Sequence, residues 1–404
     1  MRILVVGAGA LGGLVGASLA EAGEDTVMVE INAARARLLG ETGLFISREG
    51  EAERCVKLNV VTTVEGLAPV DLVFVSVKSY QTEAAVRGVM PVIGATTRVL
   101  SLQNGIGNTD TMARIIGPER VLCGITYHSV QHTGPNRLRY RPGIKPIQIA
   151  PYDGRITPEI EEIGAVFRRA GLDTDVVENV DHVTWQKLLH NAVVNPVSAV
   201  TGLSCREMLA DEDLMAFMRD LCMEIIAVMR AHGVPIVDEE DPFRPVIGSL
   251  KALGKNRPSM WQDLARGART EVDAINGAIY EEACRLGLPA PHNGALVRFI
   301  HSRERQKCLR QRSPDYWGGR TAEAGLRCRR NALRGWPSAA ACLRVGYPSR
   351  RRPSSRRWCG RASASSRRRQ TILRARSPAA RVWGRWKSFG PWVSPRTFPK
   401  TTRR

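Results

Sequence analysis

Three polar residues recur at four-residue intervals near the middle of the chain: Lys187, Asn191 and Asn195. On an α-helix this spacing places them in one stripe. Apolar residues flank the stripe, so it is suited to lining a cleft: Leu188, Leu189, Val193 and Val194. An ammonium group can donate a proton or stabilise a developing negative charge, and amides can hold a ligand by hydrogen bonds. A helix lysine alone is more often solvated, so this hypothesis depends on the rest of the chain.

A glycine-rich loop near the start of the chain has the pattern that binds a dinucleotide. It reads Gly7-Ala8-Gly9-Ala10-Leu11-Gly12, after the apolar run 2–6 and at the start of a helical stretch. The first glycine allows a tight turn, the second lets the backbone approach the pyrophosphate, and the third lets helix and strand pack closely. The helix start adds unpaired N–H groups and a positive dipole end. We therefore expect residues 7–12 to bind the pyrophosphate of a nicotinamide dinucleotide, which favours an oxidoreductase.

Glu30 ends the second apolar run, 18 residues after Gly12. That is close to the spacing of the acid that bonds the ribose hydroxyls in such domains. A carboxylate there accepts hydrogen bonds from the hydroxyls of NAD and repels the 2′-phosphate of NADP. Arg35 and Arg37 lie just beyond and could reach a phosphate. The residues alone favour NAD, and the alternative is an ordinary acidic strand end.

Short apolar runs alternate with helical stretches in the first half of the chain. The runs 2–6, 26–30, 70–77 and 98–102 are predicted strands, and 11–22 and 33–39 are predicted helices. This alternation favours an α/β fold with a mostly parallel sheet. Beyond about residue 155, apolar residues at three- and four-residue spacing predict helices over 158–170, 181–200, 211–232 and 259–286.

Local features refine this organisation. Pro196 is expected to end or bend the helix 181–200, because it removes a backbone hydrogen bond. Ser259 and Gln262 form the pattern of a capping box at the start of the helix 259–286. We expect a Rossmann dinucleotide-binding domain over 1–175, a helical domain for substrate binding and catalysis over 176–302, and a basic tail over 303–404.

The composition changes abruptly at about residue 309. Of the 59 Lys and Arg residues, 26 lie in 309–404, beside only two acids, which leaves 33 basic and 37 acidic residues in 1–308. The net charge of +20 therefore describes the tail and not the body. Three interpretations of the tail stay open: a nucleic-acid-binding arm, a disordered solvated extension, or a stretch translated out of frame. The last is favoured, so a nucleic-acid partner is not expected and the final helix is expected to be cut short near His301.

Several partner classes are not expected. The nine cysteines form no C-x-x-C pair, and no run of about 18 apolar residues occurs. We therefore expect a cytoplasmic protein with reduced thiols, without a membrane span and without a metal site. The sequence leaves a homodimer open.

Over about residues 1–302 the chain resembles the ketopantoate reductases (2-dehydropantoate 2-reductases). The resemblance rests on ordered motifs: G-A-G-A-L-G at the start, V-K-S-Y-Q-T with Lys78, L-Q-N-G-I-G-N with Asn104, W-Q-K-L-L-H-N-A-V-V-N-P with Lys187, Asn191 and Asn195, and S-M-W-Q-D…R-T-E-V-D-A-I-N-G with Ser259, Asp263, Glu271 and Asn276. It implies a Rossmann domain followed by an all-helical domain of the 6-phosphogluconate-dehydrogenase type. It also implies the NADPH-dependent reduction of 2-dehydropantoate, a small 2-oxo acid, to pantoate in pantothenate and coenzyme A synthesis.

The resemblance further implies roles for two charged residues. Lys187 would be the general acid that protonates the substrate oxygen. Glu271 would hold the substrate hydroxyl and the catalytic lysine. Without the resemblance, Glu271 would be assigned to a surface salt bridge with Arg266 or Arg269.

The remaining predicted site residues would bind ligands. Asn191, Asn195 and Ser259 would hold the substrate, with Ser259 at its carboxylate, and Lys78 and Asn104 would lie at the cofactor. The cofactor itself stays open, since the resemblance implies NADP and Glu30 favours NAD. With NAD, a dehydrogenase of another 2-hydroxy acid is the alternative function.

Overall fold

The computed structural model describes residues 1–48 and 50–312, with side chains up to residue 306. All of them lie within one unit, Met1–Tyr316. The predictions for the basic tail beyond Arg312 fall outside the described residues. The expected early end of the last helix near His301 is wrong, because helix α12 runs from Pro291 to Arg312.

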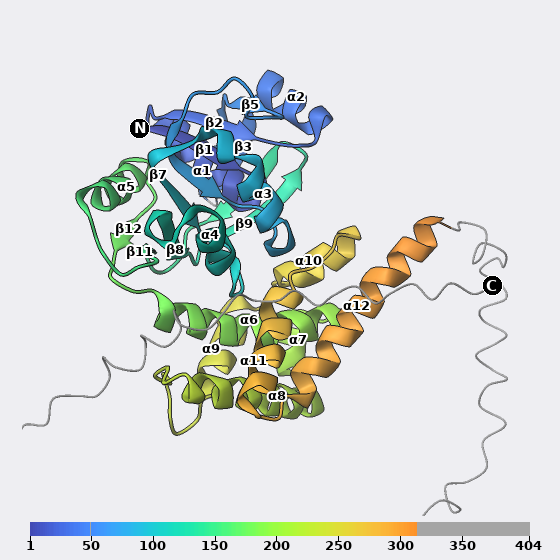
Figure 1. Cartoon of the computed structure of the whole chain (residues 1–404). Coiled ribbons are helices and arrows are strands. Elements are labelled where there is room, and N and C mark those ends of the chain that lie inside the picture. Colours follow the sequence, from blue (N-terminus) through green and yellow to red (C-terminus); the bar gives the residue numbers. More distant parts are fainter. Residues whose placement is uncertain (49, 313–404) are drawn as a thin grey trace, which may run out of the picture. The chain divides into compact units, whose positions relative to one another are not determined.

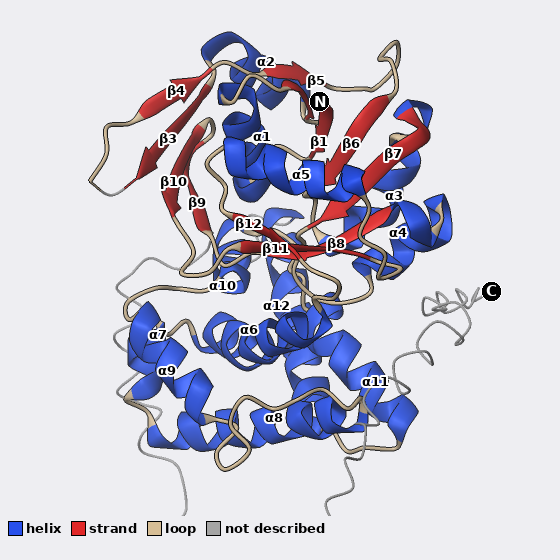
Figure 2. Cartoon of the chain, turned by 90° about the vertical axis from the view of Figure 1, so that its left-hand side faces the viewer, coloured by secondary structure: helices blue, strands red, loops and turns tan. Residues whose placement is uncertain are grey.

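Eight strands form the main sheet, in the order β12-β11-β8-β7-β6-β1-β2-β5 (Figure 1; Figure 2). Their bounds are β1 (Arg2–Val6), β2 (Asp25–Val29), β5 (Asn59–Val61), β6 (Val70–Val75), β7 (Ile93–Ser101), β8 (Val121–Ile125), β11 (Ile147–Pro151) and β12 (Thr174–Val176). All neighbours pair in parallel except β8 and β11. The predicted α/β class with a mostly parallel sheet is confirmed.

Successive residues of the central strands enter two separate cores, one on each face of the sheet. Ile3 packs in one core together with Phe167 of helix α5 (Pro158–Arg169), whereas Leu4 packs in the other together with Met112 of helix α4 (Asn108–Ile116). Burial on both faces explains why residues 3–6 are all apolar, whereas Arg2 at the start of β1 is exposed. The helices of this half are α1 (Ala10–Glu21), α2 (Ala33–Thr42), α3 (Thr82–Gly88), α4 (Asn108–Ile116) and α5 (Pro158–Arg169).

A second, four-stranded sheet packs against helix α1. Its order is β4-β3-β10-β9, with bounds β3 (Leu44–Arg48), β4 (Arg54–Val56), β9 (Ser129–Gly134) and β10 (Arg137–Arg141). Leu44, Ile46 and Leu138 join the core that contains Leu14 of α1. A Cβ on Gly13 of α1 would lie 3.1 Å from Leu138, so a small residue permits this close packing. The sequence patterns did not predict this sheet.

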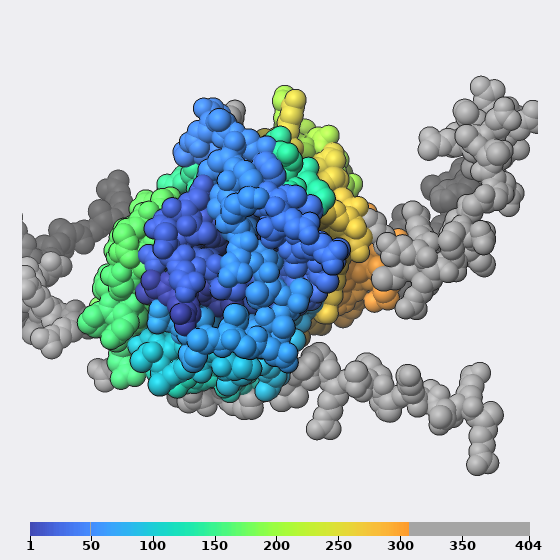
Figure 3. Space-filling model, turned by 90° about the horizontal axis from the view of Figure 1, so that it is seen from above, coloured from blue at the N-terminus to red at the C-terminus, as the bar shows by residue number. Residues whose placement is uncertain are grey.

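The segment from residue 177 to Arg312 contains helices and their connections, as predicted. The bounds are α6 (Asp181–Thr201), α7 (Cys205–Leu209), α8 (Glu212–Ala231), α9 (Arg244–Leu253), α10 (Ser259–Arg266), the π-helical turn η4 (Asp273–Gly277), α11 (Ala278–Leu286) and α12 (Pro291–Arg312). Seen from above, residues of the N-terminal half cover the visible face, and the yellow segment that includes α10 lies along one edge (Figure 3).

Two helix predictions are wrong, and one of the two outcomes expected at Pro196, a helix end or a bend, does not occur. The single helix expected over 259–286 is interrupted, because α10 ends at Gly267 with φ 77° and the chain becomes helical again at η4. No capping box forms at its start, since Pro258 is the N-cap residue and the Gln262 amide donates to the carbonyl of Arg257. Helix α6 does not end at Pro196 but continues to Thr201.

Candidate active site

A cleft of about 1490 Å³ lies between the glycine-rich loop and the helices α6 and α10. All predicted site residues except Gly12 line it: Gly7, Ala8, Gly9, Ala10, Leu11, Glu30, Lys78, Asn104, Lys187, Asn191, Asn195, Ser259 and Glu271. The fold therefore brings residues from distant parts of the sequence to one place. Within the described residues, no group of three or more His, Cys, Asp or Glu side chains is placed to hold a metal ion. None of the described helices has the length and apolar character that a membrane span requires.

The glycine-rich loop has the geometry that a dinucleotide phosphate needs. Gly7 has φ 98°, and a Cβ on Gly12 would lie 2.1 Å from the Gly7 carbonyl oxygen, so both positions require glycine. A Cβ on Gly9 would meet nothing closer than the Ser76 carbonyl oxygen at 3.8 Å, so the backbone itself borders the cleft there. No side chain caps the first turn of α1, which leaves its N–H groups available to an anion.

Glu30 follows β2 and lies almost buried at the wall of the cleft. One of its carboxylate oxygens accepts from the Asn32 backbone N–H at 2.9 Å, and the other lies 2.7 Å from Nη1 of Arg35. The Arg35 guanidinium also donates to the carbonyls of Ala8 and Pro135, at 2.6 and 3.1 Å. Arg35 thus ties α2 to the glycine-rich loop, and three acceptors engage its guanidinium.

Lys187 projects from α6 into the cleft, and its Nζ donates to the Thr126 carbonyl at 2.8 Å. Burial lowers the pKa of Lys187 to about 8, although the negative charge of Glu271 opposes this shift. An ammonium group with such a pKa releases its proton more readily than an exposed lysine. This is the property that a general acid needs near neutral pH.

Lys78, after β6, forms an ion pair with helix α10. Its Nζ lies 2.6 Å from Oδ2 of Asp263 and 3.5 Å from Oε2 of Glu271. Burial acts to lower the pKa of Lys78, but the two carboxylates outweigh it and the pKa is raised. Lys78 therefore remains a cation, and the pair joins the sheet domain to the helical domain.

Glu271 lies at the junction before η4 and not inside a long helix, which corrects the sequence-based placement. Its Oε1 accepts from the backbone N–H and from the hydroxyl of Ser79, at 3.1 and 3.0 Å. The alternative of a surface salt bridge with Arg266 or Arg269 is wrong, because these arginines pair with Asp263 and Asp273. Glu271 is buried, and its charge acts on both Lys78 and Lys187.

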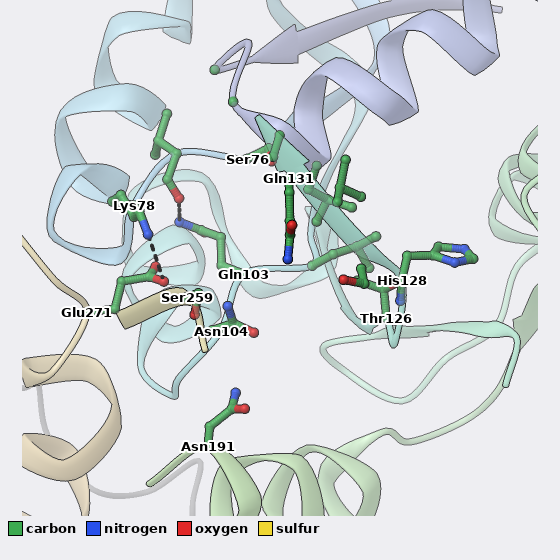
Figure 4. Close-up of a pocket in the computed structure, with 18 of the residues that line it drawn as sticks. Ser76, Lys78, Gln103, Asn104, Thr126, His128, Gln131, Asn191, Ser259 and Glu271 are labelled. Atoms are coloured by element: carbon green, nitrogen blue, oxygen red, sulfur yellow. Dashed lines mark hydrogen bonds and ion pairs between the residues drawn. The ribbon is translucent and has the colours of Figure 1, made fainter. Parts of the chain in front are cut away.

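The polar side chains predicted to bind ligands line opposite walls of the cleft. Figure 4 shows the Asn191 side chain projecting from its helix in the direction of Asn104. Asn195 lines the same cleft one helical turn after Asn191 and is buried. Because no capping bond engages the side chain of Ser259 at the start of α10, its hydroxyl and the first N–H groups of that helix can receive a carboxylate.

Three residues that hold the charged groups of the site carry no role predicted from the sequence. They are Asp263 at Lys78, Ser79 at Glu271 and Thr126 at Lys187. A signal existed for Asp263, since it follows Ser259 by four residues and therefore shares its helix face. Thr126 acts through its backbone carbonyl, which no sequence pattern reveals.

Two family models match the chain over most of its described length. Residues 3–154 match the model described as Ketopantoate reductase PanE/ApbA, and residues 179–304 match its C-terminal counterpart. The chain is 33% identical over 305 residues to the 2-dehydropantoate 2-reductase of Pyrococcus horikoshii, covering 75% of this chain and 98% of that protein. It is 32% identical over 305 residues, with the same coverage, to the 2-dehydropantoate 2-reductase of Archaeoglobus fulgidus.

Solved structures agree with this similarity. A PanE/ApbA family ketopantoate reductase from Ralstonia eutropha JMP134 superposes with a TM-score of 0.70 at 30% identity, covering 76% of this chain and 99% of that one. A D-mandelate dehydrogenase in a ternary structure with NADH and anilino(oxo)acetate shares the fold, with a TM-score of 0.70 at 23% identity and the same coverage. On the family models, the sequence identities and the fold, the chain belongs to the ketopantoate reductase family.

Proposed function

We propose that the protein reduces 2-dehydropantoate to pantoate with a nicotinamide dinucleotide, and that Lys187 is the general acid. The observation that supports this most directly is the position of Lys187. Its partly buried side chain, whose pKa desolvation lowers to about 8, lines the same cleft as the glycine-rich loop and the polar residues of α6. The relatives named 2-dehydropantoate 2-reductase supply the substrate class.

The residues present fit the cofactor. The N–H groups at the start of α1 would hold the pyrophosphate, and Glu30 would accept hydrogen bonds from the ribose hydroxyls. The bound nicotinamide supplies the hydride that the carbonyl carbon of the substrate receives. We further propose that this cofactor is NADH, because the Glu30 carboxylate at the cleft wall would repel the 2′-phosphate of NADPH and the Arg35 guanidinium is already engaged by three acceptors within the protein.

The residues of the chain would bind and polarise the 2-oxo acid. The substrate carboxylate would lie at the Ser259 hydroxyl and the N–H groups of α10. Asn191 and Asn195 would orient the carbonyl group toward Lys187 from the same face of α6.

Proton transfer completes the reduction. As the carbonyl oxygen gains negative charge, the Lys187 ammonium stabilises it and then donates its proton, so that an alcohol and a neutral amine result. The Glu271 carboxylate, whose charge acts on Lys187, favours the protonated form of the lysine before transfer. Such a general acid accelerates a reaction by roughly 10²–10⁴-fold.

A direct assay tests this proposal. The purified full chain is mixed with NADH and 2-dehydropantoate, and loss of the reduced nicotinamide is followed beside 2-oxoisovalerate and benzoylformate. We expect the highest kcat/KM with 2-dehydropantoate. Absence of turnover with 2-dehydropantoate, or a higher kcat/KM with benzoylformate, would contradict the proposal.

A further inference from the structure

The π-helical turn η4 separates α10 from α11 and begins two residues after Glu271. Its extra residue is marked by a hydrogen bond from the Gly277 N–H to the Val272 carbonyl, five residues back, at 2.9 Å. Such single turns are often found at functional sites. Here the turn contacts two segments that carry cleft residues, one through the side chain of Asn276 and one through the carbonyl of Ala274.

The first contact provides a hydrogen bond that helix α6 lacks at Pro196. In an α-helix the N–H of residue 196 would donate to the carbonyl of Ala192, but Pro196 has no N–H. The Ala192 carbonyl instead accepts from Nδ2 of Asn276 at 2.9 Å. This substitute donor explains why α6 continues past Pro196. Asn191 directly precedes Ala192, and Asn195 directly precedes Pro196. Both proposed substrate residues therefore lie in the turn of α6 that receives this hydrogen bond.

A buried chain of hydrogen bonds fixes the orientation of the Asn276 amide. The Glu224 carboxylate only accepts, so it receives Nδ2 of Asn293 at 2.9 Å and thereby turns Oδ1 of Asn293 toward Asn276. Nδ2 of Asn276 donates to that oxygen at 3.0 Å as well as to Ala192. Asn276 and Asn293 are both fully buried. The amide of Asn276 is therefore held with its donor toward α6.

The second contact reaches the loop that carries Asn104. The Ile106 N–H donates to the Ala274 carbonyl at 3.1 Å. Gly105, between Asn104 and Ile106, has φ 83°, and a Cβ there would lie 2.4 Å from the same carbonyl oxygen. The loop thus rests directly on the backbone of η4. One turn therefore contacts the segments that bear Asn104, Asn191 and Asn195, and it adjoins Glu271.

We propose that Asn276 is a positioning residue, which holds the Asn191–Asn195 turn of α6 in register for the substrate by replacing the hydrogen bond that Pro196 removes. This inference rests on the proposed substrate site. Asn276 itself contacts α6 and Asn293 and does not line the cleft. Loss of its amide should therefore weaken substrate binding, while the cofactor loop and the acidity of Lys187 stay as they are.

A double-mutant cycle with Pro196 tests the proposal. Asn276→Leu has a similar volume but no donor, and Pro196→Ala returns the backbone N–H that can reach Ala192. The four full-length proteins are compared by KM for 2-dehydropantoate, the dissociation constant for NADH, the pH dependence of kcat and the urea midpoint of unfolding. Ile279→Val, a buried change in α11, combined with Pro196→Ala, is the control for general destabilisation.

We expect Asn276→Leu to raise the KM for 2-dehydropantoate on the order of tenfold. The dissociation constant for NADH and the pH at which kcat declines should stay unchanged. Pro196→Ala alone should have the KM of wild type. Combined with Asn276→Leu, it should restore most of the lost substrate affinity. Combined with Ile279→Val, it should restore none. Equal KM losses with and without Pro196, or a parallel loss of NADH affinity, would overturn the proposal. Where the leucine variant does not fold, Asn276→Ala provides the same comparison.

Failure of the proposed function can be distinguished from failure of the inference about Asn276. Wild-type protein would then reduce no 2-oxo acid, yet the unfolding midpoints would still be measurable. A positive coupling between positions 276 and 196 in those midpoints supports the substitute hydrogen bond, and additive midpoints contradict it.

Discussion

The Lys78 ammonium lies 2.6 Å from the carboxylate of Asp263, although the two residues are 185 positions apart in the sequence. Asp263 is buried within α10, which lines the cleft, and Lys78 follows strand β6 of the sheet domain. The same lysine lies 3.5 Å from Glu271. This ion pair fixes the helical domain against the edge of the sheet where the cofactor loop lies.

Removing the Asp263 carboxylate should destabilise the folded protein. Asp263→Asn leaves Lys78 with Glu271 alone, and we expect a loss of about 1–3 kcal/mol in the free energy of unfolding. Urea unfolding measures it. The matched control is Arg266→Gln, which removes the exposed partner of the same carboxylate and should cost no more than about 1 kcal/mol. Equal losses of unfolding free energy in the two variants would show that the Lys78–Asp263 pair contributes no more to stability than the exposed pair with Arg266.

Two glycines of the cofactor loop should respond differently to alanine. In Gly12→Ala the Cβ would lie 2.1 Å from the Gly7 carbonyl oxygen, so the folded state should lose at least about 2 kcal/mol. Gly9→Ala meets no atom within 3.8 Å and should leave the stability almost unchanged. It should nevertheless weaken NADH binding on the order of tenfold, because the methyl group takes the space beside the phosphates. Unfolding midpoints and NADH titrations check both variants, and unchanged NADH binding in Gly9→Ala would contradict the assigned loop function.

Cofactor choice should depend on Glu30. We expect wild-type protein to prefer NADH over NADPH by at least about tenfold in kcat/KM, because the carboxylate repels the 2′-phosphate. Glu30→Ala removes that charge and releases Arg35, so the kcat/KM with NADPH should rise and that with NADH should fall. Glu41→Ala, an exposed change in α2, is the control. Wild-type preference for NADPH would refute the NADH assignment.

The rate of reduction should fall as the pH rises through the pKa of Lys187, because only the ammonium form donates a proton. With that pKa lowered to about 8, the decline should begin near pH 8 and not near the value of an exposed lysine. Glu271→Gln removes a negative charge that favours the ammonium, so the limb should move to lower pH. Profiles of kcat at saturating substrate and cofactor check this. Glu281→Gln is the control and should leave the pH of the decline unchanged. If kcat declines at the same pH in Glu271→Gln as in wild type, the electrostatic role of Glu271 is excluded.

The sequence predicted those parts of the site that are local. The glycine-rich loop needs only a strand, a turn and a helix, and the stripe of Lys187, Asn191 and Asn195 needs only one helix. The parallel sheet followed from continuous apolar runs. Each of these features is specified by residues close to one another in the chain.

The remaining features depend on contacts between distant segments. Helix α6 passes Pro196 because Asn276, eighty residues later in the chain, supplies the missing donor to Ala192. Glu271 leaves the expected helix because Gly267 ends α10 and the chain then packs against Ser79. The second sheet was not predicted as a unit, because its two local pairs, β3 with β4 and β9 with β10, are joined only by the long-range pairing of β3 with β10. The spacing of apolar residues within one segment does not indicate which distant segment it contacts.

The central claim is that Lys187 donates the proton in 2-oxo acid reduction, and the Lys187→Ala variant tests it most directly. NADH binding is measured first by titration, and kcat is then measured with 2-dehydropantoate. We expect an unchanged NADH dissociation constant and a kcat lowered by roughly 10²–10⁴-fold. Near-normal turnover in the alanine variant would contradict it.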